Sequence, residues 1–312
     1  MNYSILDEVT QLGGVCQGEI ISPADVLRAR YASRARGPQA GDPREGGRPG
    51  EGAAGLSHPH NSPRAVFWVG GGLMKVSRGL KLEQVGGGKR GAVVTFSDAS
   101  RRRLLYKVAQ VETDKMPLFL TITYPDKFPD DPKKWARDID AFRKRFTRRG
   151  WGAIWKKELK PRQSGESAGQ VAPHFHMLVW GANYSDLRSF CARAWWEIVG
   201  SGNLDHLAAG VRVERVNSKN GVKRYAAKYL CKEDEGQANK GGGLGRFWGV
   251  INAAVIPWAV EVPVDFDTQR PVVELLRLMR RFMGMKKRGN LPGLTMFCDA
   301  GQWFDNLHRL VT

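Results

Sequence analysis

Two histidines on one predicted strand are the first residues whose types and spacing could do chemistry. His174 and His176 lie two residues apart in the run PHFHMLVWG, whose composition is typical of a β-strand. Alternate residues of a strand project from the same face, so both imidazoles would point one way while Phe175 and Met177 would point into the core. Two imidazoles held side by side on a strand form a pair of nitrogen ligands for a divalent cation.

A carboxylate on a neighbouring strand would complete such a metal site. Glu158 lies in WKKEL, which one loop joins to the histidine run, so we expect the two runs to pair as a hairpin. His174, His176 and Glu158 together would suit Mg²⁺ or Mn²⁺. The alternative is that the histidines are ordinary polar positions on a half-exposed strand. His58 and His60 have the same spacing, but in a Gly/Pro-rich segment without rigid support, so they are not interpreted as ligands.

A pair of tyrosines offers a nucleophile. The run GVKRYAAKYLCKE predicts a helix over 221–233, on which Tyr225 and Tyr229 share one face, a turn apart. Tyrosine has a pKa of about 10 and attacks weakly unless a base or a positive charge assists it. Lys228 and Lys232 each follow a tyrosine by three residues and would favour the phenolate. The alternative is a buried aromatic pair beside solvated lysines.

Composition points to a polyanionic partner. The 312 residues include 49 Lys and Arg against 31 Asp and Glu, for a net charge of +18. This excess favours nucleic acid over a generally basic soluble protein or a membrane-surface protein. The four cysteines form no CxxC pair, which disfavours a zinc knuckle or a disulfide framework. No apolar run approaches the ~18 residues of a membrane span, and no secretory signal is evident, so we expect a cytoplasmic protein of a bacterial cell without a membrane partner.

Hydrophobic periodicity predicts the elements that must position these groups. An amphipathic helix is predicted over 131–149, with Asp130 or Asp131 as cap, and a second over Ser185–Gly200. The run PLFLTITYP predicts a central strand. The other predicted elements are strands and turns in AVFWVGGGLMKV and VGGGKRGAVVTFSD, a helix in SDASRRRLLYKVAQVE capped by Ser97 or Ser100, strands at WGAIWKKEL, VRVERV and AAVIPWAVEV, and a basic helix near Val272–Lys287.

From residue 118 the predicted order is β, α, β, β, α, β, α. This order predicts an α+β fold, with an open antiparallel or mixed sheet and helices packed on one face. Residues 1–63 are expected to be a largely disordered Gly/Pro-rich tail and linker. Residues 64–262 are expected to form the domain that carries the chemistry, and 263–312 a basic helical C-terminal extension.

Three basic segments have open roles. Arg101–Arg103 and the cluster Arg143–Arg149 could contact DNA or could be solvated helix faces. The C-terminal run LLRLMRRFMGMKKR could bind DNA, self-associate or pack as core, and our interpretation is an accessory DNA-binding or dimer element. The sequence leaves the oligomeric state open.

The motifs together resemble a known superfamily. PLFLTITYP, PHFHMLVWG and YAAKYLCK, in this order, are similar to the three motifs of the HUH endonucleases, and most of all to two-tyrosine initiators of rolling-circle replication in plasmids and single-stranded DNA phages. The resemblance covers about Leu118–Gly249 and includes GRFWGV. It implies a central antiparallel sheet of ferredoxin-like or RRM-like type, and a nicking endonuclease domain over 64–262.

The resemblance also implies roles for the candidate residues. His174 and His176 would be the metal-binding pair, Glu158 the acidic third ligand, and Tyr225 and Tyr229 the two nucleophiles, with Tyr229 acting first. The expected substrate is single-stranded or hairpin origin DNA. No GxxxxGK[ST] phosphate loop occurs, so a host helicase would unwind the DNA and a host polymerase would extend it.

Rival interpretations are of two kinds. A two-tyrosine transposase or a conjugative relaxase would use the same chemistry. A non-catalytic module would instead bind RNA or DNA through aromatic and arginine side chains. Such a module would bind nucleic acid in the presence of a chelator and would form no covalent adduct.

Overall fold

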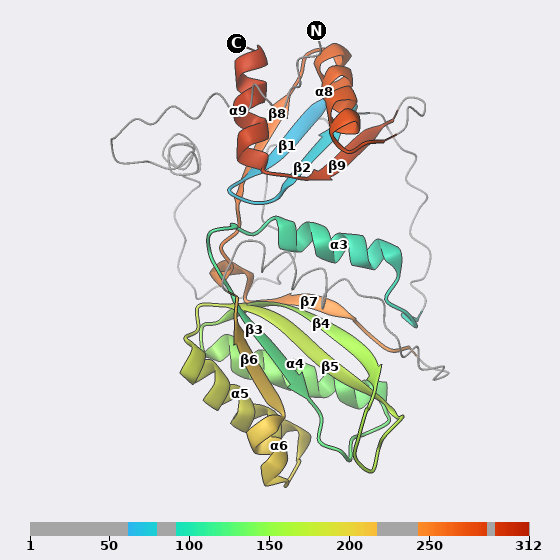
Figure 1. The fold of residues 1–312 in the computed structure, drawn as a ribbon, viewed down its shortest axis with the longest axis vertical. Coiled ribbons are helices and arrows are strands. Elements are labelled where there is room, and N and C mark those ends of the chain that lie inside the picture. The colour runs from blue at the N-terminus through green and yellow to red at the C-terminus, as the bar shows by residue number, and fades with distance from the viewer. Residues whose placement is uncertain (1–61, 80–91, 217–242, 286–290, 312) are drawn as a thin grey trace, which may run out of the picture. The chain divides into compact units, whose positions relative to one another are not determined.

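The structure, a computed structural model, describes residues 62–79, 92–216, 243–285 and 291–311, with side chains to 307 at the C-terminal end (Figure 1). All of them belong to one compact unit, Ala54–Thr312. The predicted tail over 1–63 lies outside the described residues except for its last two positions. The predicted tyrosine helix over 221–233 lies wholly outside them.

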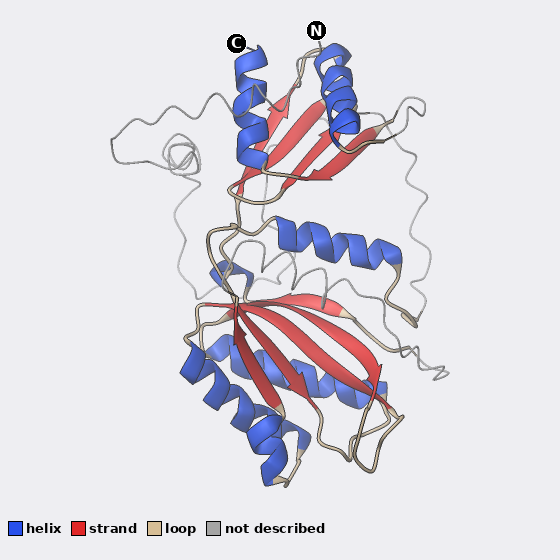
Figure 2. Ribbon diagram, viewed as in Figure 1, coloured by secondary structure: helices blue, strands red, loops and turns tan. Residues whose placement is uncertain are grey.

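A five-stranded antiparallel sheet carries the histidine strand. Its strand order is β6-β3-β5-β4-β7, so β5 is central and the predicted strand PLFLTITYP lies beside it as β3. With the helices around it, the sheet confirms the predicted α+β class (Figure 2). The strands are β3 (Leu118–Thr123), β4 (Gly152–Pro161), β5 (Val171–Trp180), β6 (Val211–Arg215) and β7 (Trp248–Ile251).

Two long helices, α4 (Pro132–Arg148) and α5 (Tyr184–Val199), pack on one face of this sheet, as Figure 1 shows. The α4 helix begins where the sequence predicts, because the Asp131 side chain accepts a hydrogen bond from the Lys133 amide. The α5 helix begins one residue earlier than predicted, because Asn183 is its cap, and ends at Gly200 with φ 61°. A short helix that sequence periodicity did not predict, α6 (Leu204–Ala209), follows it.

Aromatic side chains fill the layer between the sheet and these helices. The Phe175 ring lies 5.8 Å from that of Trp195 and 6.1 Å from that of Trp155, centroid to centroid. Trp195 also packs edge-on against Tyr124 and Phe142. All five side chains are buried. Burial of one such ring contributes about 1.5–3 kcal/mol, so this layer is a main source of stability for the sheet.

Helix α3 (Asp98–Ala109) covers part of the opposite face (Figure 1). Ser97, one of the two predicted caps, accepts from the Ser100 amide. Leu104 and Val108 join the same core as the sheet. The preceding run AVVTF was predicted to be extended, but residues 92–97 form no strand, although the Leu244 amide donates to the Val93 carbonyl within this run.

A four-stranded antiparallel sheet, of order β8-β1-β2-β9, joins the N-terminal part of the described chain to its C-terminal part. The predicted boundary at residue 262 falls inside β8, and β1 and β2 pair with strands almost 200 residues away instead of with the domain that follows them in sequence. Local periodicity carries no information on such distant partners. The elements are β1 (Arg64–Val69), β2 (Leu73–Ser77), β8 (Val260–Asp265), β9 (Gly293–Phe297), α8 (Gln269–Phe282) and α9 (Ala300–Val311).

The C-terminal region differs from its predicted form in several ways. The run AAVIPWAVEV was predicted to be one strand, but residues Ala253–Val255 form a 3-10 turn after Asn252, whose φ is 47°, and the strand begins only at Val260. Strand β9 and helix α9 had no predicted counterpart. In α8 an apolar stripe is buried against the sheet, as the core-packing alternative requires; it comprises Val272, Leu275, Leu276 and Met279. None of the described helices combines the length and the apolar composition that a membrane crossing requires.

Candidate functional site

The hairpin of β4 and β5 brings the predicted ligands together. Glu158 is paired directly opposite His174, and Lys156 directly opposite His176, which confirms the predicted hairpin. On the other side of β5, Thr121 is paired opposite His176. Directly opposed residues of an antiparallel pair share a face, so all five side chains lie on the face away from α4 and α5.

His176 is held by polar contacts on both sides of its ring. Its Nε2 lies 2.7 Å from Oε2 of Glu158, and its Nδ1 lies 3.0 Å from Oγ1 of Thr121. An ionised carboxylate can only accept, so Nε2 carries the proton of this bond, and the Thr121 hydroxyl donates to Nδ1 of the neutral ring. The ring of Phe119 stacks against the imidazole at 5.8 Å with an interplanar angle of 12°. These contacts fix the position and orientation of the ring.

The protonation states suit a ligand set. Burial raises the pKa of Glu158, but the hydrogen bond and charge of His176, with the charge of Lys156, more than offset this and leave the pKa below its usual value. Burial, with the charge of His176, lowers the pKa of His174 to about 4. Near neutral pH Glu158 is therefore a carboxylate and His174 a neutral imidazole, which are the forms that bind a cation.

The donor types fit a divalent metal, although the side chains are not arranged around one. Two imidazole nitrogens and one carboxylate oxygen suit Mn²⁺ or Mg²⁺. Within the described ranges, however, no three His, Cys, Asp or Glu side chains are grouped so that they could hold a metal ion. The direct bond from His176 to Glu158 accounts for part of this, because it occupies the lone pairs that would face a cation.

Several residues of this face were missed in the sequence. Thr121 alternates with the buried Leu120 and Ile122 in the strand LFLTIT, and this period of two was the signal that could have identified it. Lys156 is fully buried, with its ammonium 4.8 Å from the centre of the Phe96 ring. A buried lysine between strand residues of this kind gives no distinct pattern, because WKKEL reads equally well as a half-exposed strand.

The loop between β4 and β5 is fastened to the end of β3. The Arg162 guanidinium donates to the backbone carbonyls of Tyr124 at 2.6 Å and of Pro125 at 2.5 Å. The Asp126 carboxylate accepts from the Ser167 hydroxyl at 2.6 Å and from the Glu166 amide at 2.8 Å. These bonds restrain the ends of the strands on which Glu158 and His174 lie.

The predicted nucleophiles are not among the described residues. Tyr225, Tyr229, Lys228 and Lys232 all fall in the range 217–242, outside the part of the chain that the structure describes. Their distance from the histidines therefore stays a prediction.

One comparison with known proteins gives a match. Residues 117–234 match the family model of the replication-associated protein ORF2. The matched range includes β3, β4 and β5 with both histidines and Glu158, and extends through Tyr225 and Tyr229. No curated protein and no solved structure shows significant similarity to the chain. The family match supports a replication initiator.

Proposed function

We propose that the protein initiates rolling-circle DNA replication by nicking single-stranded origin DNA through a tyrosine and later rejoining the strand. The observation that carries the proposal is the placement of His174, His176 and Glu158 on one sheet face, within the segment similar to replication-associated proteins. The net charge of +18 suits a substrate made of phosphates.

The three residues of the hairpin would hold Mg²⁺ or Mn²⁺ in this proposal. When bound, the ion would supply positive charge to the scissile phosphate as negative charge develops on it. His176 can take part because Thr121 can either donate or accept. When Nε2 gives up its proton and becomes a ligand, Nδ1 carries the proton instead and donates to Oγ1 of Thr121, 3.0 Å away.

Tyr229 is the proposed first nucleophile. Its phenol loses a proton, with Lys228 and Lys232 favouring the phenolate, and the oxygen bonds to phosphorus as the bond to the 3′ oxygen breaks. The products are a 5′-phosphotyrosine and a 3′-hydroxyl that takes up a proton and can prime synthesis. Tyr225 then attacks the regenerated junction, and the free 3′-hydroxyl displaces the first tyrosine to close the strand. One phosphodiester replaces another in each step, so no nucleoside triphosphate is needed.

A covalent adduct assay tests the proposal. The full chain is incubated with labelled origin single strand and Mn²⁺, and a denaturing gel is examined for a protein–DNA band. We expect the band with the parent protein, a strong loss with Tyr229→Phe, and no band with the double variant Tyr225→Phe/Tyr229→Phe. Full nicking by the double variant would exclude tyrosine attack at these positions.

A further inference from the structure

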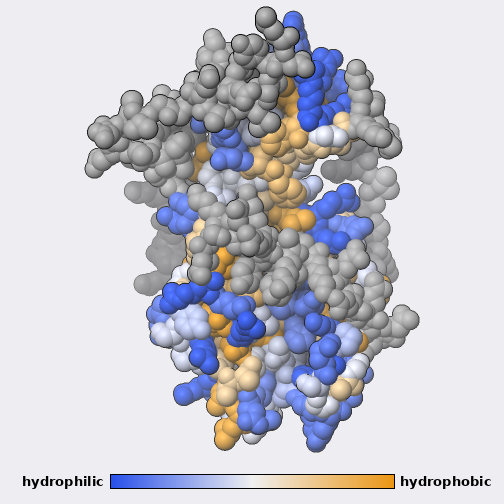
Figure 3. All heavy atoms as spheres, in the orientation of Figure 1, coloured by the Kyte–Doolittle hydropathy of each residue, from blue (hydrophilic) through white to orange (hydrophobic). Residues whose placement is uncertain are grey.

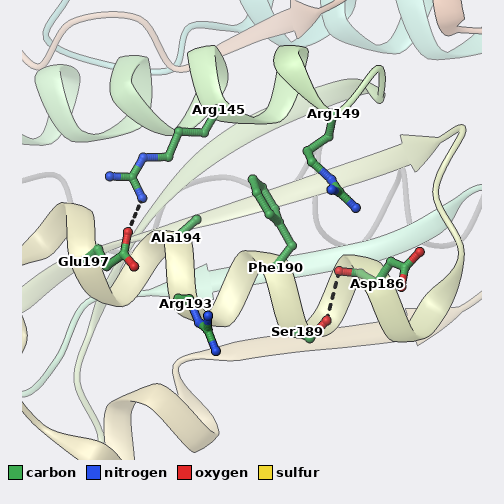
Figure 4. Close-up of a pocket in the computed structure, with 8 residues that line it drawn as sticks. All are labelled: Arg145, Arg149, Asp186, Ser189, Phe190, Arg193, Ala194 and Glu197. Atoms are coloured by element: carbon green, nitrogen blue, oxygen red, sulfur yellow. Dashed lines mark hydrogen bonds and ion pairs between the residues drawn. The ribbon is translucent and has the colours of Figure 1, made fainter.

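A groove runs between the outward sides of α4 and α5, with a volume of about 350 Å³ (Figure 4). Arg145 and Arg149 line it from α4, and Phe190 and Arg193 line it from α5. These two helices cover the sheet face opposite to the histidines, so the groove is separate from the candidate metal site (Figure 1).

The charges in this α4/α5 groove are unevenly matched. Arg145 is neutralised by Glu197, with 2.5 Å between Nη1 and Oε2. Asp186 is occupied at the start of α5, where its carboxylate accepts from the Asn183 side chain at 2.6 Å. In the part of the chain that the structure describes, neither Arg149 nor Arg193 has a carboxylate partner, and both are exposed. The groove therefore presents two uncompensated guanidinium groups.

Arg149 is also held in position. Its guanidinium carbon lies 5.0 Å from the centre of the Trp151 ring and 5.3 Å from that of Phe190. Stacking of this kind restricts the long side chain while it leaves the edge of the guanidinium, with its N–H donors, open to a ligand. Less side-chain entropy is then lost when an anion binds.

A polymer of phosphates fits this groove better than a single small anion. The groove is open along two helices, and exposed basic residues, Lys144, Arg148 and Arg188, extend the charge beyond its lining. Hydrophilic residues prevail over the lower half of the view in Figure 3, where these helices lie. Guanidinium groups bind phosphate oxygens in a two-pronged geometry, and contacts spaced along a backbone add to one another.

We propose that the α4/α5 groove binds the sugar-phosphate backbone of DNA through Arg149 and Arg193, on the side of the sheet away from the histidines. The proposal concerns binding alone and does not require that the protein nicks DNA. A strand that reaches both faces must pass around the edge of the sheet, so the groove would bind DNA some distance from the segment at the histidines.

Fluorescence anisotropy with labelled DNA and a chelator tests the groove independently of any nicking. The full chain is titrated with a long single strand and with a duplex of the same sequence, at several salt concentrations. For Arg149→Gln/Arg193→Gln we expect a roughly tenfold weaker affinity and a shallower salt dependence, with a slope smaller by about 2. The arm with the larger loss identifies single-stranded or duplex DNA as the ligand of the groove.

Two further variants control for charge and folding. Lys133→Gln/Arg137→Gln removes the same charge from exposed positions of α4 outside the groove and should change the affinity by less than the groove variant. Arg149→Lys/Arg193→Lys keeps the charge and should restore most of the salt slope. An equal loss in the Lys133/Arg137 variant, or no loss in the groove variant, would overturn the proposal. An equal loss of binding to polyglutamate would assign the groove to acidic polypeptides instead and overturn it too.

Discussion

The two faces of the five-stranded sheet have opposite compositions, although the same strands build both. The face under α4 and α5 is aromatic and apolar, with Phe175 and Trp155 packed against Trp195. The other face carries a polar set in which His176, Glu158 and Thr121 are linked by hydrogen bonds. Both sets are largely shielded from water.

This difference shows how the chain separates stability from chemistry. Alternation along β5 sends Phe175 and Met177 to the helices and His174 and His176 to the opposite side. Apolar burial on the first face stabilises the sheet, whereas buried polar groups on the second cost desolvation and are retained only with partners. A substitution on each face should therefore have a different main effect, and each of the following measurements tests that separation.

The largest effect is expected on the apolar face. Phe175→Ala removes a ring that is 1% exposed and contacts two tryptophans, so we expect a loss of about 4 kcal/mol in the free energy of unfolding, measured by denaturant titration. Phe175→Leu, the matched control, should lose about 1–2 kcal/mol. A loss below about 1 kcal/mol for the alanine variant would show that this layer does not stabilise the sheet as described.

On the polar face we expect loss of activity without a comparable loss of stability. His174→Gln/His176→Gln should lower Mn²⁺-dependent nicking roughly thousandfold, because the charge stabilisation supplied through these residues is worth several kcal/mol. The control His58→Gln/His60→Gln removes a pair of the same spacing and should nick like the parent protein. If the His174/His176 variant nicked normally, the polar face would have no part in the reaction.

Acid should act on the polar face before it acts on the apolar one. The pKa of His174 falls from an ordinary 6.5 to about 4 in the folded protein, so the unfolded chain binds more protons between these values. The stability that depends on this group is complete above about pH 6.5 and is lost as the pH falls toward 4, by about 2–3 kcal/mol near pH 4.5. Unfolding titrations without metal should show this loss in the parent protein and a smaller one in His174→Gln. The same pH dependence in both would assign the proton uptake to another group.

The smallest expected effect is that of the hydroxyl behind His176. Thr121→Val removes the partner of Nδ1, so the ring is no longer fixed and Mn²⁺ affinity, measured by calorimetry, should fall about 10–100-fold. Thr123→Val is the matched control, because Thr123 lies on the same strand as Thr121 but its hydroxyl donates to the Gly210 carbonyl. Equal affinities for the two variants would show that Thr121 does not position the ligand.

Much of the local structure was predictable from neighbouring residues. The α4 helix was predicted within a residue at each end, since its cap, its first-turn proline and its apolar spacing all act over one or two turns. The β4–β5 hairpin was predictable for a similar reason, because one loop joins two runs of clear strand character. The run AAVIPWAVEV was misread, because its apolar composition outweighed the turn at Asn252 and Pro257.

The sequence by itself determined which residues could do chemistry, since the two-residue spacing of His174 and His176 places them on one face of any strand. Only the tertiary structure decided that Thr121 fixes one of these rings, that Lys156 is buried beside it, and that β1 and β2 pair with β8 and β9. The physical reason is range. Side-chain periodicity is a property of a few consecutive residues, whereas strand partners and burial depend on contacts between segments far apart in the chain.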